Sequence, residues 1–130
     1  MQEGKPYLLV VDDQLGVRRL LFEAFSEEGY EVALAASGLE AIARVKDRLP
    51  NLILMDMKMP GMNGLEALQE IKKFYPQVLV IMMTAYGELE IVAEAMKIGA
   101  REYIPKPFDL NDLRTLVKNV LDENKAMQAS

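Results

Sequence analysis

Five short runs along this chain have the pattern of apolar and polar residues that is typical of β-strands. Residues 7–11, 52–55 and 78–82 are continuous apolar runs, which are typical of strands buried on both faces. Residues 30–34 alternate between apolar and polar side chains and predict a strand at the edge of a sheet. Residues 102–104 predict a last, short strand.

The segments between these runs have helical spacing and recognisable ends. Ser-x-x-Glu at residues 37–40 and Asn-x-x-Glu at residues 63–66 are capping boxes, which begin helices. Asp109 is a natural N-cap for the last helix, whose apolar pattern fades near Asp122. We therefore expect a helix after each strand.

Alternating strands and helices predict an α/β fold, a (βα)5 doubly wound domain around a five-stranded parallel sheet. The expected strand order is 2-1-3-4-5, with the topological switch point between the first and third strands. No linker, repeat or low-complexity tract interrupts the chain, so residues 1–130 are expected to form a single domain. We expect its core at about residues 6–122 and flexible ends at 1–5 and 124–130.

Polar residues stand where four of the predicted strands end: Asp12 and Asp13, Asp56, Thr84, and Lys106. In an open parallel sheet the ligand site lies beyond the carboxyl ends of the strands, so we expect these side chains to converge. Carboxylates that are crowded together repel one another unless a cation joins them. Oxygen ligands without nitrogen or sulfur favour Mg²⁺, with Mn²⁺ as the alternative.

A lysine and a hydroxyl beside a metal-bound carboxylate indicate phosphoryl chemistry. Asp56 can act as a nucleophile and form an acyl phosphate. Lys106 supplies a compact positive charge and Thr84 a hydroxyl donor, and both can anchor phosphoryl oxygens. Pro107 permits a cis peptide bond, which would aim Lys106 inward.

The amino-acid composition excludes several classes of catalytic site and several kinds of binding partner. The chain has no cysteine and no histidine, which excludes disulfides, thiolate nucleophiles, a Ser-His-Asp triad and imidazole metal ligands. Its formal net charge is −5 and no run of Lys or Arg forms a basic face, so we expect no direct binding of nucleic acid. No apolar stretch is long enough for a signal-peptide core or a bilayer span, which predicts a cytoplasmic protein without membrane contact.

Four fragments, VVDDQ, LMDMKMPGMNG, MMTAYGE and YIPKPFD, occur in this order within residues 7–121. Together they resemble the receiver domain of bacterial response regulators. The resemblance implies that Asp56 is the phosphoacceptor. It also implies that Asp12, Asp13 and the backbone carbonyl of Lys58 hold Mg²⁺ together with Asp56.

By the same resemblance, Thr84 and Lys106 contact the phosphoryl group, and Tyr103 occupies the aromatic switch position that turns inward as the Thr84 hydroxyl moves. Such a domain is not a turnover enzyme, although it promotes its own aspartyl phosphorylation and slow dephosphorylation. Lys58 lies two residues after the acceptor and Tyr86 two residues after Thr84. We hypothesise that these two long side chains flank the pocket mouth and prolong the phosphoryl state.

The likeness is closer to the single-domain receivers of sporulation phosphorelays, which pass a phosphoryl group from histidine kinases to a histidine phosphotransferase. It departs at Tyr103, where such a receiver has histidine, and at Pro105. The expected partners are a sensor histidine kinase and a histidine phosphotransferase, and the expected state is a monomer or weak dimer. The residues expected to receive the helical bundle of the donor are Gln14, Val17, Leu20, Pro107 and Phe108.

Four alternatives share part of this pattern. A flavin carrier would need a Ser/Thr/Gly-rich loop where Asp12 and Asp13 stand. A haloacid-dehalogenase-type phosphatase would carry its nucleophile after the first strand in an Asp-x-Asp-Gly-Thr pattern, whereas this chain keeps its extra acid at Asp56. A metal-independent pseudo-receiver would lack the complete set of site residues. The fourth alternative is the N-terminal receiver of a longer transcriptional regulator whose output domain is missing.

Overall fold

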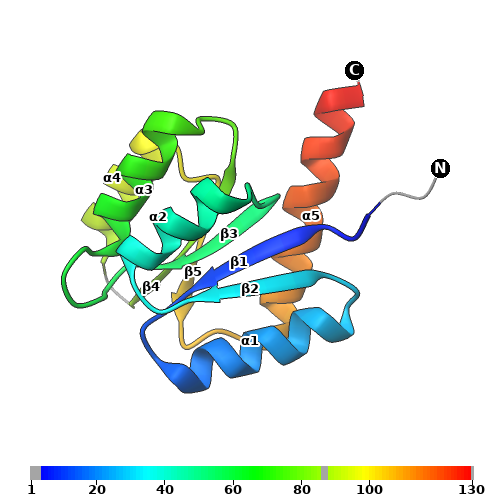
Figure 1. Cartoon of the computed structure of the whole chain (residues 1–130), viewed down its shortest axis with the longest axis horizontal. Coiled ribbons are helices and arrows are strands. Elements are labelled where there is room, and N and C mark those ends of the chain that lie inside the picture. Colours follow the sequence, from blue (N-terminus) through cyan, green and yellow to red (C-terminus); the bar gives the residue numbers. More distant parts are fainter. Residues whose placement is uncertain (1–3, 86–87, 130) are drawn as a thin grey trace.

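Five strands and five helices alternate along the chain in a computed structural model that describes residues 4–85 and 88–129 (Figure 1). The strands are β1 (Tyr7–Val11), β2 (Glu31–Ala35), β3 (Leu52–Asp56), β4 (Leu79–Ala85) and β5 (Glu102–Lys106). The helices are α1 (Leu15–Glu27), α2 (Gly38–Asp47), α3 (Gly64–Phe74), α4 (Leu89–Ile98) and α5 (Leu110–Ala129).

The strands form one parallel sheet in the order β2-β1-β3-β4-β5, which confirms the predicted order. The chain reverses its winding direction between β1 and β3, so the switch point lies there. Val11 of β1 pairs with Met55 of β3, and Asp12 and Asp56 are the next residues of their segments. The register therefore brings these two carboxylates to the same edge of the sheet.

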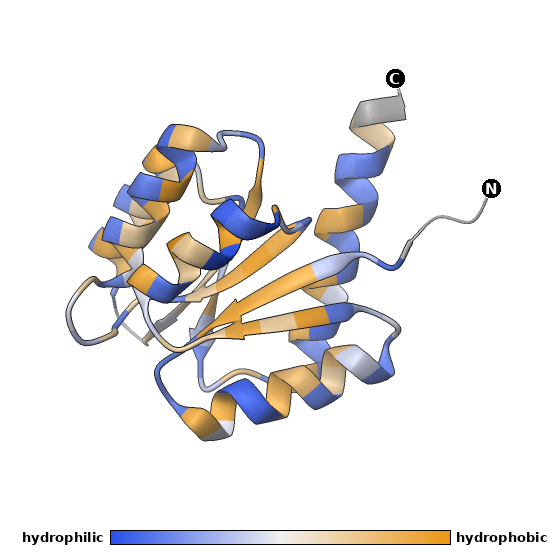
Figure 2. Cartoon of the chain, in the orientation of Figure 1, coloured by the Kyte–Doolittle hydropathy of each residue, from blue (hydrophilic) through white to orange (hydrophobic). Residues whose placement is uncertain are grey.

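Two apolar clusters cover the two faces of the sheet, because alternate residues of each strand point to opposite sides. Leu9 and Val11 of β1 belong to the cluster that packs against α2, α3 and α4. Leu8 and Val10 belong to the cluster that packs against α1 and α5. Figure 2 shows mostly apolar strands in the sheet and helices in which apolar and polar residues alternate. This burial on both faces explains why the inner strands are continuous apolar runs.

The helix starts follow the predicted capping residues. Asn63 and Glu66 form a complete capping box, in which the Asn63 side chain accepts from the Glu66 amide at 2.9 Å and the Glu66 side chain accepts from the Asn63 amide at 3.0 Å. The Ser37 hydroxyl accepts from the Glu40 amide at 3.1 Å, whereas the Glu40 side chain accepts from the amide of Ala36.

The last helix is longer than the apolar pattern predicts and continues past Asp122 to Ala129. The apolar stripe ends there, but residues 108–129 contain no glycine or proline to end the helix. A Lys118–Asp122 ion pair at 2.9 Å and an ion pair between Glu123 and Arg101, which directly precedes β5, lie where the helix passes Asp122. Over the two described stretches of the chain, none of the helices has the length and apolar character that crossing a bilayer requires.

Candidate functional site

Three carboxylates meet at the carboxyl end of the sheet. Asp12 follows β1, Asp13 is its neighbour, and Asp56 is the last residue of β3, and one oxygen of each lies within 4.8 Å of the others. Asp12 is fully buried and Asp56 is 6% exposed, while Asp13 is exposed. Burying like charges this close together is costly unless a cation offsets them.

The backbone around Asp12 is held by several hydrogen bonds. The Asp12 amide donates to the carbonyl of Ala35 at 3.1 Å, and the Asp12 Oδ1 accepts from the amide of Gln14 at 2.9 Å. The Arg18 guanidinium of α1 donates to the Asp12 carbonyl oxygen at 2.7 Å. These contacts fix Asp12 at the switch point. They involve its backbone and its Oδ1, so its Oδ2 is available to another partner.

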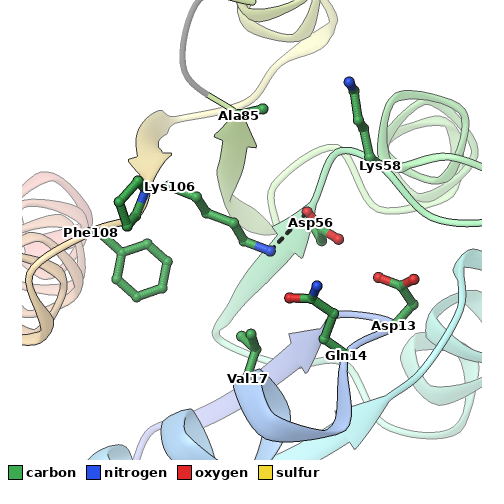
Figure 3. Close-up of a pocket in the computed structure, with 9 residues that line it drawn as sticks. Asp13, Gln14, Val17, Asp56, Lys58, Ala85, Lys106 and Phe108 are labelled. Atoms are coloured by element: carbon green, nitrogen blue, oxygen red, sulfur yellow. Dashed lines mark hydrogen bonds and ion pairs between the residues drawn. The ribbon is translucent and has the colours of Figure 1, made fainter.

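That partner is Lys106, the last residue of β5. Its Nζ lies 2.7 Å from Asp12 Oδ2 and 3.2 Å from Asp56 Oδ1, so one ammonium bridges two strand ends. Figure 3 shows its contact with Asp56. The Lys106–Pro107 peptide bond is cis. Burial opposes the charge on the ammonium, but the hydrogen bonds and charges of Asp12 and Asp56 outweigh it and raise the pKa of Lys106.

The surroundings of Asp56 disfavour its ionised form, and a bound cation would offset this effect. Burial, followed by the charge of Asp12, raises the pKa of Asp56 to about 6, and the nearby Lys106 ammonium offsets only part of this rise. A divalent cation beside these oxygens would favour the ionised and therefore nucleophilic form.

The donor set fits a hard divalent cation. Three carboxylates offer one oxygen each within a small space, and among the described residues one ammonium lies against two of them, so negative charge remains in excess. Oxygen-only ligands are those that Mg²⁺ and Mn²⁺ take, and Mg²⁺ keeps several waters beside one or two carboxylates. Asp13 is exposed, so such waters can reach the site.

Gly64, at the start of α3, has a positional role that the sequence analysis missed. Its amide donates to the Met57 carbonyl at 2.9 Å, and a Cβ built on it would lie 2.1 Å from the Asp56 carbonyl oxygen. Only glycine can therefore pack α3 this closely against the backbone of the acidic site. Gly64 is the last residue of the fragment LMDMKMPGMNG, but its close contact depends on the path of the loop between β3 and α3.

Thr84 and Tyr103 lie on the adjacent strands β4 and β5, two positions apart in the register. Thr84 is buried in β4, and Tyr103 of β5 is 39% exposed. A cavity of about 260 Å³ lies between them, lined also by Leu89 and Val92 of α4 and by Pro105. The Tyr103 ring therefore stands at the rim of a space that reaches the Thr84 side chain.

A larger pocket of about 570 Å³ opens above the acidic cluster (Figure 3). Most of the residues predicted to dock a partner line it, and Leu20, which is 49% exposed on α1, does not. Tyr86, which was predicted to prolong the phosphoryl state, lies outside the described residues. The lining residues are Asp13, Gln14, Val17, Asp56, Lys58, Ala85, Lys106, Pro107 and Phe108.

The Lys58 side chain extends away from Asp56 in Figure 3, and its partner is a residue that the sequence analysis did not single out. Lys58 Nζ lies 3.2 Å from Glu88 Oε2, and Glu88 Oε1 accepts from the Ala85 amide at 3.2 Å. Glu88 directly precedes α4 and is largely buried, with 16% of its side chain exposed.

Comparison with known proteins identifies a family with this arrangement. The model of the response regulator receiver domain matches residues 8–118. Sporulation initiation phosphotransferase F of Bacillus subtilis is 46% identical over 114 residues, which are 88% of this chain and 92% of that protein. Regulatory protein AtoC of Escherichia coli is 42% identical over 88% of this chain but over only 25% of its own length.

Solved structures of receivers have the same fold. A CheY-like response regulator receiver domain protein from Methanospirillum hungatei superposes with a TM-score of 0.92 at 35% identity, over 95% of this chain and 99% of the other. The receiver domain of NtrX from Brucella abortus superposes with a TM-score of 0.84 at 35% identity, over 88% of this chain and 98% of the other.

Proposed function

Because this chain belongs to the response regulator receiver family, we propose that Asp56 accepts a phosphoryl group from a phosphohistidine donor. The observation that carries the proposal is the Lys106 ammonium, which lies against Asp56 and Asp12 at the floor of an open pocket. A buried carboxylate in reach of a fixed ammonium is suited to nucleophilic attack on phosphorus.

We propose that Asp12, Asp13, Asp56 and the backbone carbonyl of Lys58 hold Mg²⁺, for which Mn²⁺ can substitute. When it is bound, the cation neutralises charge on the carboxylates and on the phosphoryl oxygens. The support for this assignment is the spacing of the three carboxylates and their excess of negative charge over the Lys106 ammonium.

In the transfer itself, an Asp56 carboxylate oxygen forms the new bond to phosphorus as the phosphorus–nitrogen bond of the donor breaks, and the donor imidazole leaves with the bonding electron pair. Lys106 and the Thr84 hydroxyl bind phosphoryl oxygens, and Lys106 keeps its charge throughout because its pKa is raised. The chain is not a turnover enzyme in this scheme, because the product remains on the protein until a second acceptor or water takes it.

The phosphoryl state is then transmitted by Thr84 and Tyr103. We propose that the Thr84 hydroxyl moves toward the phosphoryl group and that the Tyr103 ring turns into the cavity between β4, β5 and α4. The half-exposed ring and the cavity beside it support this switch. Lys58 would shield the acyl phosphate from water and so prolong it.

The partners proposed are a sensor histidine kinase and a histidine phosphotransferase, in keeping with the similarity to a sporulation phosphotransferase. Gln14, Val17, Pro107 and Phe108 surround the mouth of the Asp56 pocket and would contact the helical bundle that presents the histidine. The flavin-carrier and phosphatase alternatives are set aside, because the family match spans most of the chain.

Intact mass after incubation with acetyl phosphate tests the proposal, with and without Mg²⁺, on the native chain and on Asp56→Asn. We expect a single phosphoryl gain that requires both Mg²⁺ and Asp56. If no gain appears with acetyl phosphate or with a phosphohistidine donor, the chain is a pseudo-receiver that signals by binding alone.

A further inference from the structure

The Glu88 carboxylate contacts donor groups of two residues that line the Asp56 pocket, which is the pocket of about 570 Å³ above the acidic cluster. Its Oε1 accepts from the Ala85 amide at 3.2 Å and its Oε2 lies 3.2 Å from Lys58 Nζ. Ala85 and Lys58 both line the pocket, whereas Glu88 does not. One carboxylate that does not line the pocket therefore binds one donor group from each of two residues that do.

These two donors are of the kind that binds phosphoryl oxygens. Backbone N–H groups and lysine ammonium groups are the donors that proteins use for phosphate, and both gain strength when the acceptor is charged. Lys58 extends away from Asp56, in the direction that its ion pair with Glu88 requires (Figure 3). An anionic group on Asp56 would present a second acceptor to the same two donors.

We infer that Glu88 is a positioning residue whose carboxylate takes the place of a phosphoryl group at Ala85 and Lys58 while Asp56 is unmodified. This inference rests on the proposed phosphorylation of Asp56. The phosphoryl group displaces Glu88 from both donors, and the displacement lowers the net affinity of the pocket for the phosphoryl group. Because Glu88 directly precedes α4, its release also alters the start of that helix beside the Tyr103 cavity.

The first test needs no phosphoryl group and no metal. Amide hydrogen exchange of Ala85 is measured in the native chain, in Glu88→Gln, in Glu88→Ala and in the control Glu90→Gln. Glu90 is an exposed carboxylate in the first turn of α4, so its substitution removes the same charge without the two contacts. We expect faster exchange in Glu88→Ala, a smaller increase in Glu88→Gln, which keeps an acceptor oxygen, and no change in Glu90→Gln.

The second test measures binding of beryllium trifluoride, a phosphoryl mimic, in the presence of Mg²⁺. Removing the competing carboxylate should strengthen binding roughly three- to tenfold in Glu88→Gln. Glu90→Gln should stay within about twofold of the native chain, which separates a specific contact from a general effect of charge. In a Lys58→Met background the gain from Glu88→Gln should shrink, because one of the two released donors is then missing.

The outcomes distinguish the inference from the function on which it rests. If native protein and Glu90→Gln gain phosphoryl mass and bind the mimic, but Glu88→Gln and Glu88→Ala bind it no more tightly, the inference is wrong and the function stands. If native protein neither gains mass nor binds the mimic, the proposed function fails first. Unchanged exchange at Ala85 in Glu88→Ala overturns the inference whatever the phosphoryl assays show.

Discussion

At the scale of single residues, the site concentrates more negative charge than its one bridging ammonium can offset. Asp12 is fully buried and receives both a backbone N–H and Lys106, whereas Asp56 shares only Lys106. Burial, followed by the charge of Asp12, raises the pKa of Asp56 to about 6, and Lys106 offsets only part of the rise. The fold therefore disfavours the ionised form of the residue that is proposed to react.

A prediction about pH follows from this pKa. Because the folded-state pKa of Asp56 lies above its ordinary value of about 4, the folded state binds more protons than the unfolded state between about pH 4 and pH 6. In metal-free buffer, this carboxylate therefore makes the free energy of unfolding decrease as pH rises through that window. Asp56→Asn should be more stable than the native chain at pH 7.5 by about 1–3 kcal/mol.

Urea unfolding in EDTA from pH 4 to pH 8 measures this difference directly. The gap between Asp56→Asn and the native chain should be small near pH 4 and reach its full size above pH 6. A gap that is constant over the whole range would show that Asp56 titrates alike in the folded and unfolded states, and the electrostatic account of the site would then be incorrect.

At the scale of elements, the loop after β3 is held against β4 and against the start of α3. The Met57 amide donates to the carbonyl of Met83 at 3.0 Å, which joins the end of β3 to β4. Gly64 then brings the start of α3 against the backbone of Asp56. The position of the reactive carboxylate is therefore set by how closely a helix approaches a strand end, and not by side-chain contacts alone.

Gly64→Ala should disturb the site through this approach. The added Cβ would meet the Asp56 carbonyl oxygen at 2.1 Å, so α3 must move away or β3 must bend. We expect a loss of about 1–3 kcal/mol in the free energy of unfolding and slower phosphorylation by acetyl phosphate. Gly16→Ala is the matched control, because nothing lies within 4 Å of its added Cβ in α1. That variant should be as stable as the native chain or more stable, and wild-type kinetics in both variants would argue against a role for the α3 contact.

The docking of a donor can be tested at the junction of α1 with the loop after β5. Phe108→Ala should slow transfer from a phosphohistidine protein at least about fivefold, as expected when an anchor of an interface is truncated. It should spare phosphorylation by acetyl phosphate, because Phe108 lies in the pocket wall and has no polar group to offer the reaction. Leu20→Glu, outside the pocket on the exposed side of α1, tests how far the interface extends along the helix. Equal losses with both donors would refute a docking role for Phe108.

At the scale of the whole molecule, the sheet order and the residues at the strand ends could be predicted from the sequence, and the contacts between loops could not. Apolar runs and turn positions are local patterns, and parallel pairing then brings Asp12, Asp56 and Lys106 together without further information. The contact of Gly64 depends on the path of the loop after β3, and Glu88 pairs with Lys58 from a different loop, so no periodic spacing along the sequence reveals either contact.

The continuation of α5 past Asp122 was missed for a different reason. The residues after Leu121 are mostly polar and continue no apolar stripe. Periodicity detects a helix through the face that it buries, so a helical end without a buried face gives no such signal. The sequence thus predicts the core-facing part of α5 and understates its length.

Binding of Mg²⁺ should be linked to the stability of the entire domain, because the three carboxylates converge only when β1 and β3 are paired. A ligand that binds only the folded state raises the free energy of unfolding with its concentration, by about 2.7 kcal/mol at a hundredfold excess over Kd. Thermal unfolding over a Mg²⁺ titration should therefore show a rising Tm in the native chain and a much smaller rise in Asp12→Asn and Asp13→Asn. The magnesium-induced rise should persist in Glu90→Gln, whose carboxylate lies on α4. If Mg²⁺ raised the Tm equally in all four proteins, the ion would be acting on the general surface charge, and the acidic cluster would not be its site.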